Sequence, residues 1–257
     1  MSTVAMLPEI ELVQVSKRYG EGQHVLSGID LAIERGEFVS IIGPSGCGKS
    51  TVLKLVSGLS QVSEGGLMVN GMTPRNAREI MSYIFQDATL LPWRTVEQNV
   101  GLGLELEHVA RDRRAERVQS LLSLVGLQHV AKHYPRQLSG GMKMRVSIAR
   151  ALATTPRVLL MDEPFAALDE MSRDRLNEEL LRLREEQKWT VLFVTHSVAE
   201  AVFLSSRIVV LAPHPGRVAQ IVPVDLPYPR NAGTRTSEAF DRMVSRVSKA
   251  LREAHTS

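Results

Sequence analysis

The most informative stretch of the sequence is a glycine-rich loop followed directly by a lysine and a serine. It comprises Gly43, Pro44, Ser45, Gly46, Cys47, Gly48, Lys49 and Ser50. Successive backbone N–H groups beside a helix N-terminus form a concave anion site, and glycine lets the backbone approach a phosphate closely. In such a loop Lys49 reaches the outer phosphates and Ser50 places its hydroxyl on Mg²⁺. The pattern therefore predicts a nucleotide site, against the alternative of a glycine-rich turn with a lysine nearby by chance. Within the loop, Cys47 is interpreted as a small space-filling residue rather than a redox centre.

A second pattern is an apolar run that ends in two carboxylates. Residues 158–161 are all apolar, and Asp162 and Glu163 follow them. An acidic strand end delivers negative charge to the carboxyl edge of a parallel sheet, where the glycine loop also lies. Asp162 is predicted to hold the metal, directly or through water, and Glu163 to polarise the attacking water. The alternative is an acidic strand end that only caps the next helix.

A third pattern is the turn Ser139, Gly140, Gly141 and Met142, which opens a helix that runs through Arg150. A Ser-Gly-Gly turn at a helix start is another anion-binding geometry. In isolation a simple capped helix start explains it better. Its position between the glycine loop and Asp162 favours a functional interpretation.

The elements that must position these residues follow an α/β pattern with a largely parallel sheet, because short apolar runs alternate with longer helix-like stretches. Strands are predicted at Ile10 to Val15, Glu37 to Ile42, Ile80 to Phe85, Val158 to Asp162, Thr190 to Thr195 and Ile208 to Leu211. Helices are predicted at Ser50 to Gly58, Glu116 to Val125 and Met142 to Ala153. No strand is expected between Glu97 and Thr154, so this stretch predicts a helical insertion. From Pro213 the chain is Pro- and Gly-rich, and then basic and helical.

The bulk properties fit a globular protein of 257 residues with one core or a core and a small satellite domain. No apolar run approaches the roughly 20 residues that cross a bilayer, and the first residues show no secretory signal. A single cysteine excludes an internal disulfide and fits a reducing cytosol. The net charge of +3 is a weak hint of an acidic partner. Because the basic residues are spread beside acidic ones, we expect no nucleic-acid partner.

Taken in their order along the chain, these motifs resemble those of the nucleotide-binding subunits of ABC transporters, over roughly residues 9–229. The glycine loop with Thr51 resembles the family's Walker A, the strand before Asp162 and Glu163 resembles its Walker B, and Ser139 to Gly141 resembles its signature. Met142 departs from the glutamine common there and resembles a variant of nitrate, sulfonate and taurine importers. Further family positions are filled by Tyr19 (adenine stacking), Gln86 (contact with metal and water), Asp169 (D-loop) and His196 (switch histidine on the terminal phosphate).

The resemblance implies a P-loop NTPase core with a mostly parallel sheet, an antiparallel β subdomain and an inserted helical subdomain. The corresponding ranges are 9–229 for the ATPase domain, about 88–157 for the helical subdomain, and 230–257 for a basic helical tail. This tail could pack on its own domain, dock a partner or be partly disordered.

The resemblance also implies an ATPase that uses ATP and Mg²⁺, with Glu163, His196 and Lys49 as catalytic groups and Ser50, Gln86 and Asp162 at the metal. Each ATP would lie between the glycine loop of one subunit and the signature of a second copy. The implied partners are two integral membrane permease subunits and an extracytoplasmic solute-binding protein, with this chain peripheral on the cytoplasmic face of the cell membrane. Leu90, Leu91 and Trp93 suggest a docking surface, or else packing under the helical subdomain.

Other classes remain open on the residues. A soluble ABC ATPase that acts on ribosomes or DNA normally carries two cassettes or a long coiled-coil insertion, and this sequence shows neither. A P-loop kinase or GTPase gives no reason for the Ser139 turn and His196. A protein of the family that binds ATP without hydrolysing it usually lacks the counterpart of Glu163 or of His196, whereas this sequence has both.

Overall fold

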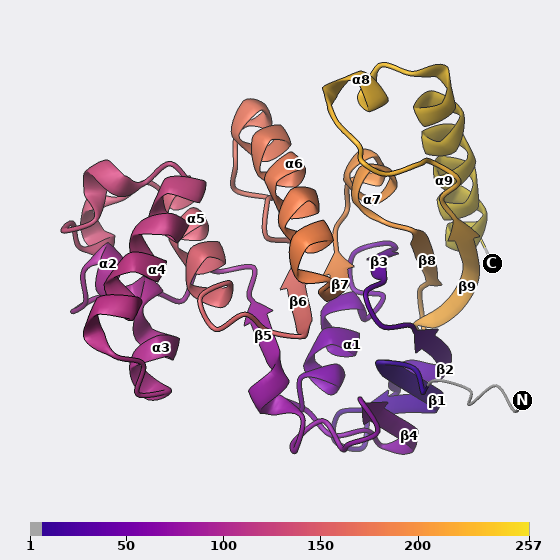
Figure 1. The fold of residues 1–257 in the computed structure, drawn as a ribbon. Helices are drawn as coiled ribbons and strands as arrows, with labels where there is room; N and C mark the ends of the chain where they lie inside the picture. The colour runs from indigo at the N-terminus through magenta and orange to yellow at the C-terminus, as the bar shows by residue number, and fades with distance from the viewer. Residues whose placement is uncertain (1–6, 257) are drawn as a thin grey trace, which may run out of the picture.

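The computed structural model describes residues 7–256 and contains two β-sheets with helices between and around them (Figure 1). The larger sheet has the strand order β5-β6-β7-β3-β8-β9. Its strands are β5 (Met81–Ile84), β6 (Val158–Asp162), β7 (Thr190–Val194), β3 (Phe38–Ile42), β8 (Arg207–Ala212) and β9 (Arg217–Pro223). All neighbours are parallel except β8 and β9. Every residue of β3, β6 and β7 is buried, because helices or a second sheet cover both faces.

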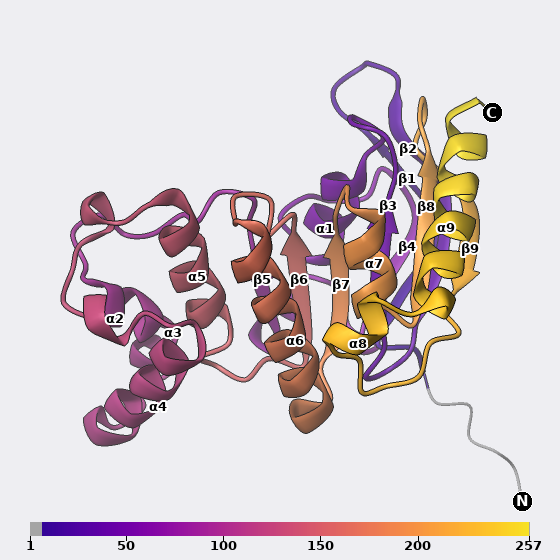
Figure 2. The same ribbon diagram turned by 90° about the horizontal axis from the view of Figure 1, so that it is seen from above.

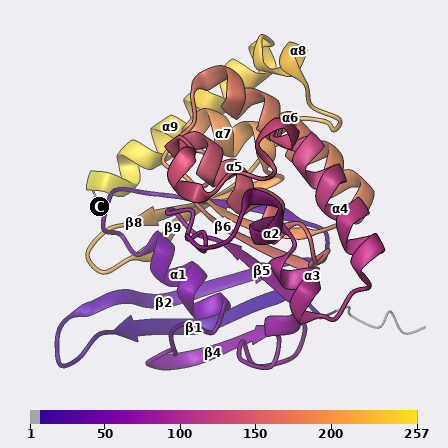
Figure 3. The same ribbon diagram turned by 90° about the vertical axis from the view of Figure 1, so that its left-hand side faces the viewer.

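The smaller sheet is antiparallel, with the order β2-β1-β4. Its strands are β1 (Ile10–Arg18), β2 (His24–Ile33) and β4 (Glu64–Val69). At the end of β2, Ile29, Leu31 and Ile33 are buried while the residues between them are exposed, so only one face joins the core. Helix α1 (Lys49–Val56) lies between the two sheets (Figure 3) and buries Val52, Leu53, Leu55 and Val56 in the same cluster.

A helical part is inserted between β5 and β6 and stands to one side of the sheets (Figure 1). It contains α2 (Val96–Val100), α3 (Leu102–Leu106), α4 (Arg111–Leu124) and α5 (Gly140–Ala151), with short 3-10 turns at Gln128–Val130 and Pro135–Gln137. Buried faces of α4 and α5, including Leu121, Leu122 and Ile148, join the core that lies on the other face of the large sheet. Among the described residues, the chain between β5 and β6 contains no strand, as the sequence predicted.

The remaining helices cover the face of the large sheet opposite α1 (Figures 2 and 3). They are α6 (Glu170–Gln187), α7 (Val198–Leu204), α8 (Ala232–Arg235) and α9 (Glu238–Thr256). Helix α9 buries Phe240, Met243, Val247, Ala250 and Ala254, which recur at three- and four-residue spacing. It packs against α7, β8 and β9. The tail therefore packs on its own domain in this chain.

Two side chains before α8 hold the tail to the end of α7. Arg230 is only 4% exposed. Its guanidinium donates hydrogen bonds to the carbonyls of Val202, Phe203 and Ser205, each at 2.9 Å. The Tyr228 hydroxyl donates to the Leu204 carbonyl at 2.8 Å. Since the last carbonyls of a helix have no partner within it, these contacts satisfy the buried C-terminal end of α7.

Three strands were not located from the sequence: β2, β4 and β9. The first two supply the expected antiparallel subdomain, whereas β9 lies within the segment predicted only as Pro- and Gly-rich. Strand β9 is at an edge of the sheet and exposes Ala219, Gln220 and Ile221 in succession, so it lacks the alternation that marks a half-buried strand. Over residues 7–256, none of the helices combines the length and the apolar character needed to span a bilayer.

Candidate functional site

The glycine loop connects the end of β3 to the start of α1, in the centre of the large sheet. Gly43 has no room for a side chain, because a Cβ there would lie 2.7 Å from Cys47 Sγ and 2.8 Å from the Leu211 carbonyl oxygen. Gly48 caps α1 with φ 96°, a backbone conformation that favours glycine. The loop thus turns tightly between strand and helix and directs the helix N-terminus at its own concave side.

Lys49 is 8% exposed and its ammonium is held over this loop. Its Nζ donates to the carbonyl oxygens of Gly43 at 2.9 Å and Pro44 at 3.0 Å. These acceptors are neutral carbonyls, so neither compensates the positive charge in the way a carboxylate would. A buried cation without a counter-charge favours an anionic ligand.

The loop serine meets the carboxylate at the end of β6. Ser50 Oγ donates to Asp162 Oδ1 at 2.9 Å, and the Tyr83 hydroxyl donates to Asp162 Oδ2 at 3.4 Å. Burial raises the pKa of Asp162, and the Ser50 hydrogen bond opposes that rise. Burial, followed by the negative charge of Asp162, raises the pKa of Tyr83, so this hydroxyl stays a donor. A hydroxyl and a carboxylate side by side provide the hard oxygen ligands that Mg²⁺ prefers.

The next residue, Glu163, points to the histidine that follows β7. Glu163 has φ 47°, an uncommon conformation for a residue with a side chain. Its N–H donates to the Val194 carbonyl at 2.9 Å, which fixes the turn against β7. Its Oε2 lies 3.2 Å from His196 Nδ1, and the histidine ring is mostly exposed. A carboxylate and an imidazole are thereby paired at the carboxyl edge of the sheet, beside the strand that leads into the glycine loop.

The Ser139 turn begins α5 in the inserted helical part. Ser139 is the N-cap, and its Oγ accepts a hydrogen bond from the Met142 N–H at 3.3 Å. A Cβ added at Gly140 would meet no other atom, whereas one at Gly141 would lie 3.3 Å from Leu168 Cδ2. The turn is therefore open on one side and packed against the loop before α6 on the other. Figure 1 places α5 beyond β5, while α1 begins in the middle of the sheet at β3.

Asp169 caps α6 by accepting a hydrogen bond from the Ser172 N–H at 2.9 Å. Hydrogen bonding from the Ser172 side chain, followed by that from its backbone, lowers the pKa of the aspartate. Gln86 follows β5 and is exposed at the same edge of the sheet as Asp162. Tyr19 lies between β1 and β2 and is half exposed, with Lys17 Nζ 4.7 Å from its ring centroid.

The structure thus brings the loop, Gln86, Asp162, Glu163 and His196 to one edge of the large sheet, because they follow neighbouring strands. The Ser139 turn and Tyr19 belong to other parts of the chain.

Two residues that support the site were missed by sequence reasoning. Tyr83 was assigned only to a strand, because its contact with Asp162 depends on the pairing of β5 with β6. Gly216 lies in the turn between β8 and β9, and a Cβ there would be 2.1 Å from the Cys47 carbonyl oxygen. This turn therefore lies directly behind the glycine loop. The signal for it was the glycine in the Pro- and Gly-rich segment after Pro213.

A cavity of about 590 Å³ lies on the outer wall of the glycine loop. Gly43, Pro44 and Ser45 form one side of it, and the last turns of α9, with Leu251, Arg252 and His255, form the other. The end of the C-terminal helix is thus next to the loop.

Cys47 should react slowly with a maleimide in the folded protein and rapidly after unfolding. Its side chain is 1% exposed, and burial raises the pKa of its thiol, so little reactive thiolate is present at neutral pH. Since the chain has one cysteine, a mass spectrum of the intact protein counts the adducts directly. The control is Ser245→Cys, which places a thiol on the exposed face of α9. Equal labelling rates at both positions in the native protein would contradict the buried placement of Cys47.

The fold and this edge define a P-loop nucleoside-triphosphatase: a strand, a phosphate-type loop and a helix, with a carboxylate from a parallel strand facing the loop serine. Comparison with known proteins narrows the class. The ABC transporter family pattern matches residues 26–166. A putative ATP-binding protein of Brucella abortus is 46% identical, over 96% of this chain and 94% of the relative. The aliphatic sulfonates import ATP-binding protein SsuB of Bacillus licheniformis is 43% identical, over 93% of each chain.

Among solved structures, the chain is similar to the ATP-binding cassette MJ0796, determined as a dimer in a post-hydrolysis state bound to ADP and Pi. The TM-score is 0.78 at 33% identity, covering 85% of this chain and 100% of the other. The chain therefore belongs to the ATP-binding proteins of the ABC transporter family, and it is an ATPase.

Proposed function

We propose that this chain is the ATP-hydrolysing subunit of a bacterial importer for a small solute, an anion of the nitrate, sulfonate or taurine kind. The main support for ATP hydrolysis is the contact of Glu163 with His196 at 3.2 Å, beside a glycine loop with a buried lysine. Support for the solute class comes from relatives named for aliphatic sulfonate import.

In the proposed reaction the glycine loop binds the phosphates of ATP through its backbone N–H groups, and Lys49 moves its donors from carbonyls of the loop to the outer phosphates. Ser50, Asp162 and the exposed Gln86 would hold Mg²⁺, because they offer hydroxyl, carboxylate and amide oxygens. When bound, Mg²⁺ neutralises part of the charge on the outer phosphates. Tyr83 orients the carboxylate of Asp162 from the other side.

Glu163 accepts a proton from the attacking water, and the oxygen of that water attacks the terminal phosphorus as the bond to the ADP oxygen breaks. His196 orients the Glu163 carboxylate and reaches the terminal phosphate from the exposed side of its ring. Most of the rate enhancement then comes from position and charge rather than from covalent chemistry.

The complete site requires a second copy of the chain. The Ser139 turn is open at Gly140 but lies in the inserted helical part, away from the glycine loop of its own chain. A head-to-tail homodimer would place the signature of one subunit, Ser139 to Met142, over the nucleotide held by the other. Tyr19 would stack on the adenine, and Asp169 would lie at the dimer interface.

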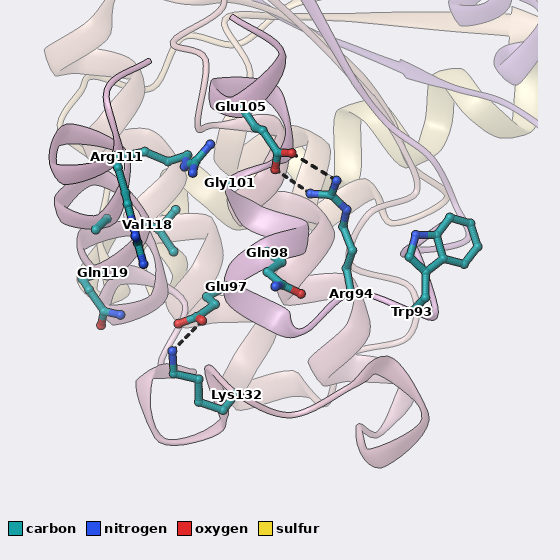
Figure 4. A pocket seen from close by; sticks show the side chains of 12 residues that line it. Trp93, Arg94, Glu97, Gln98, Gly101, Glu105, Arg111, Val118, Gln119 and Lys132 are labelled. Carbon is teal, nitrogen blue, oxygen red and sulfur yellow. Dashed lines mark hydrogen bonds and ion pairs between the residues drawn. The ribbon is translucent and has the colours of Figure 1, made fainter. Parts of the chain in front are cut away.

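The inserted helical part carries a groove that suits a permease loop (Figure 4). This cavity of about 650 Å³ is lined by Trp93 and by charged side chains from α2, α3 and α4. Two ion pairs stand in it, Arg94 with Glu105 and Lys132 with Glu97, each at 2.6 Å. Leu90 and Leu91 are half-buried, but Trp93 is 70% exposed. Tryptophan and arginine are enriched among the residues that contribute most to protein binding, and this groove offers both.

Replacing Trp93 with alanine should weaken capture of the permease subunits by about 30-fold, since truncation of a hot-spot residue costs roughly 2 kcal/mol. The measurement is affinity capture of the membrane subunits in detergent by the purified full-length chain. Leu59→Ala, which removes an exposed apolar side chain after α1, is the control. Equal capture by the Trp93 variant and by wild type would exclude the groove as the docking surface.

The same capture experiment tests the importer function against a soluble ABC ATPase that acts on ribosomes or DNA. We expect two permease subunits to co-purify with the chain, at the cytoplasmic face of the membrane, and the assembled transporter to take up solute delivered by an extracytoplasmic binding protein. Recovery of the chain with ribosomes or DNA, and not with a membrane protein, would overturn the proposal.

A further inference from the structure

A partly buried ion pair links the first turns of two helices, α6 and α7, which follow the loop 167–169 and the turn 195–197. It links Arg173, in the first turns of α6, to Glu200 in α7, with Arg173 Nε 3.4 Å from Glu200 Oε1. Glu200 is 7% exposed, and burial raises the pKa of its carboxyl. A carboxylate at such a position costs free energy unless its oxygens are matched. Neither residue contacts ATP, Mg²⁺ or the attacking water in the proposed reaction.

On the α6 side, the guanidinium reaches the loop that precedes the helix. Arg173 Nη2 donates to the Leu168 carbonyl at 2.9 Å. Leu168 is the residue whose side chain packs against Gly141 of the Ser139 turn. Nη2 of the guanidinium is therefore fixed to the loop 167–169, while its Nε lies opposite Glu200.

On the α7 side, the second carboxylate oxygen of Glu200 holds the turn that carries His196. Thr195 Oγ1 donates to Glu200 Oε2 at 2.6 Å, and the same hydroxyl oxygen accepts a hydrogen bond from the Ser197 N–H at 3.0 Å. The bonded residues, Thr195 and Ser197, flank His196 on both sides. Both oxygens of the Glu200 carboxylate are thus used, one on each loop.

Because His196 is itself exposed, little besides this turn and its contact with Glu163 fixes the ring. We propose that Arg173 and Glu200 are positioning residues for hydrolysis: together they fix the turn 195–197 relative to the loop 167–169, so that His196 meets Glu163. This inference rests on the proposed function, because it assigns the pair to the same reaction. Charge neutralisation alone does not require a guanidinium that also bonds Leu168.

The test compares Glu200→Gln and Arg173→Lys with the wild-type chain. Glutamine keeps the shape and an acceptor for Thr195 but loses the charge opposite Arg173. Lysine keeps the charge but cannot contact both loops as the guanidinium fork does. We expect kcat for ATP to fall by about 10-fold in each, since small displacements of a catalytic group are costly, while the Kd for ATP, measured separately, stays unchanged. The double variant should lose no more than the worse single variant.

The second measurement is hydrogen exchange of the amides in residues 195–200, which needs no activity. Both variants should exchange faster there than wild type, with no change in the central strand β3. Tyr228→Phe is the control, since it removes one hydrogen bond at the opposite end of α7 and touches neither loop. It should lower the melting temperature slightly and leave kcat unchanged.

Three results would overturn the inference: full kcat in Arg173→Lys, unchanged exchange at 195–200 in both variants, or an equal fall in kcat in Tyr228→Phe at equal loss of stability. If the wild-type chain hydrolyses no ATP, the proposed function fails, and the exchange measurement still decides whether the pair holds the turn.

Discussion

Replacing Glu163 with glutamine should lower steady-state ATP hydrolysis by about 10²- to 10⁴-fold, the range that a positioned general base contributes. ATP binding should persist. The amide keeps the size of the side chain and can still contact His196, whereas it cannot accept the proton of the attacking water. Glu163 lies in a turn held by its own N–H and by β7, so the substitution should leave the glycine loop undisturbed.

The measurement is phosphate release under saturating ATP, together with the Kd for ATP from a fluorescent analogue. Glu107→Gln, on the exposed end of α3, makes the same chemical change away from the site and should behave as wild type. Near wild-type turnover of the Glu163 variant would remove this residue from the role of base.

Replacing Lys49 with alanine should weaken ATP binding by about 10- to 100-fold, since a hydrogen bond to a charged group contributes roughly 1.5–3 kcal/mol. The Lys49 ammonium is buried against neutral carbonyls of the loop, so its charge is available to the phosphates. Removing it leaves those carbonyls without their donor as well.

Isothermal titration with ATP and Mg²⁺ gives the Kd directly. Lys249→Ala, on the exposed face of α9, serves as the matched loss of one lysine. A Kd that stays at the wild-type value in the Lys49 variant would contradict the phosphate role of the loop.

The sequence predicted most of the parallel sheet because its central strands, β3, β6 and β7, are buried on both faces and so are continuous apolar runs. The strand Val158–Asp162 has the predicted limits, and the other predicted strands of this sheet differ from the structure by one residue at one or both ends. The fold class was predicted correctly, and solved ABC cassettes confirm it. Strands β2, β4 and β9 were not predicted. Strands β2 and β4 contain glycine and have exposed residues, β9 is exposed at three successive residues, and the pairing of a strand depends on tertiary context.

For the candidate site, residue types and order gave Lys49, Asp162, Glu163 and His196, and the structure brings them to one edge. The tertiary contacts that support these residues could not be predicted from the sequence. Ser50 and Asp162 lie 112 positions apart yet share a hydrogen bond. Tyr83, Gly216 and the pair of Arg173 with Glu200 are each ordinary residues in a helix, strand or turn until the tertiary fold gives them partners.

The closeness of α9 to the glycine loop has a practical consequence for labelling. Since His255 lines the same cavity as Pro44 and Ser45, a fluorophore placed at that position would respond to changes in the loop wall. A bulky reporter protein fused directly behind this helix would start close to the outer wall of the glycine loop and could press on it. The C-terminal helix is therefore a good place for a small optical probe and a poor one for a large fusion.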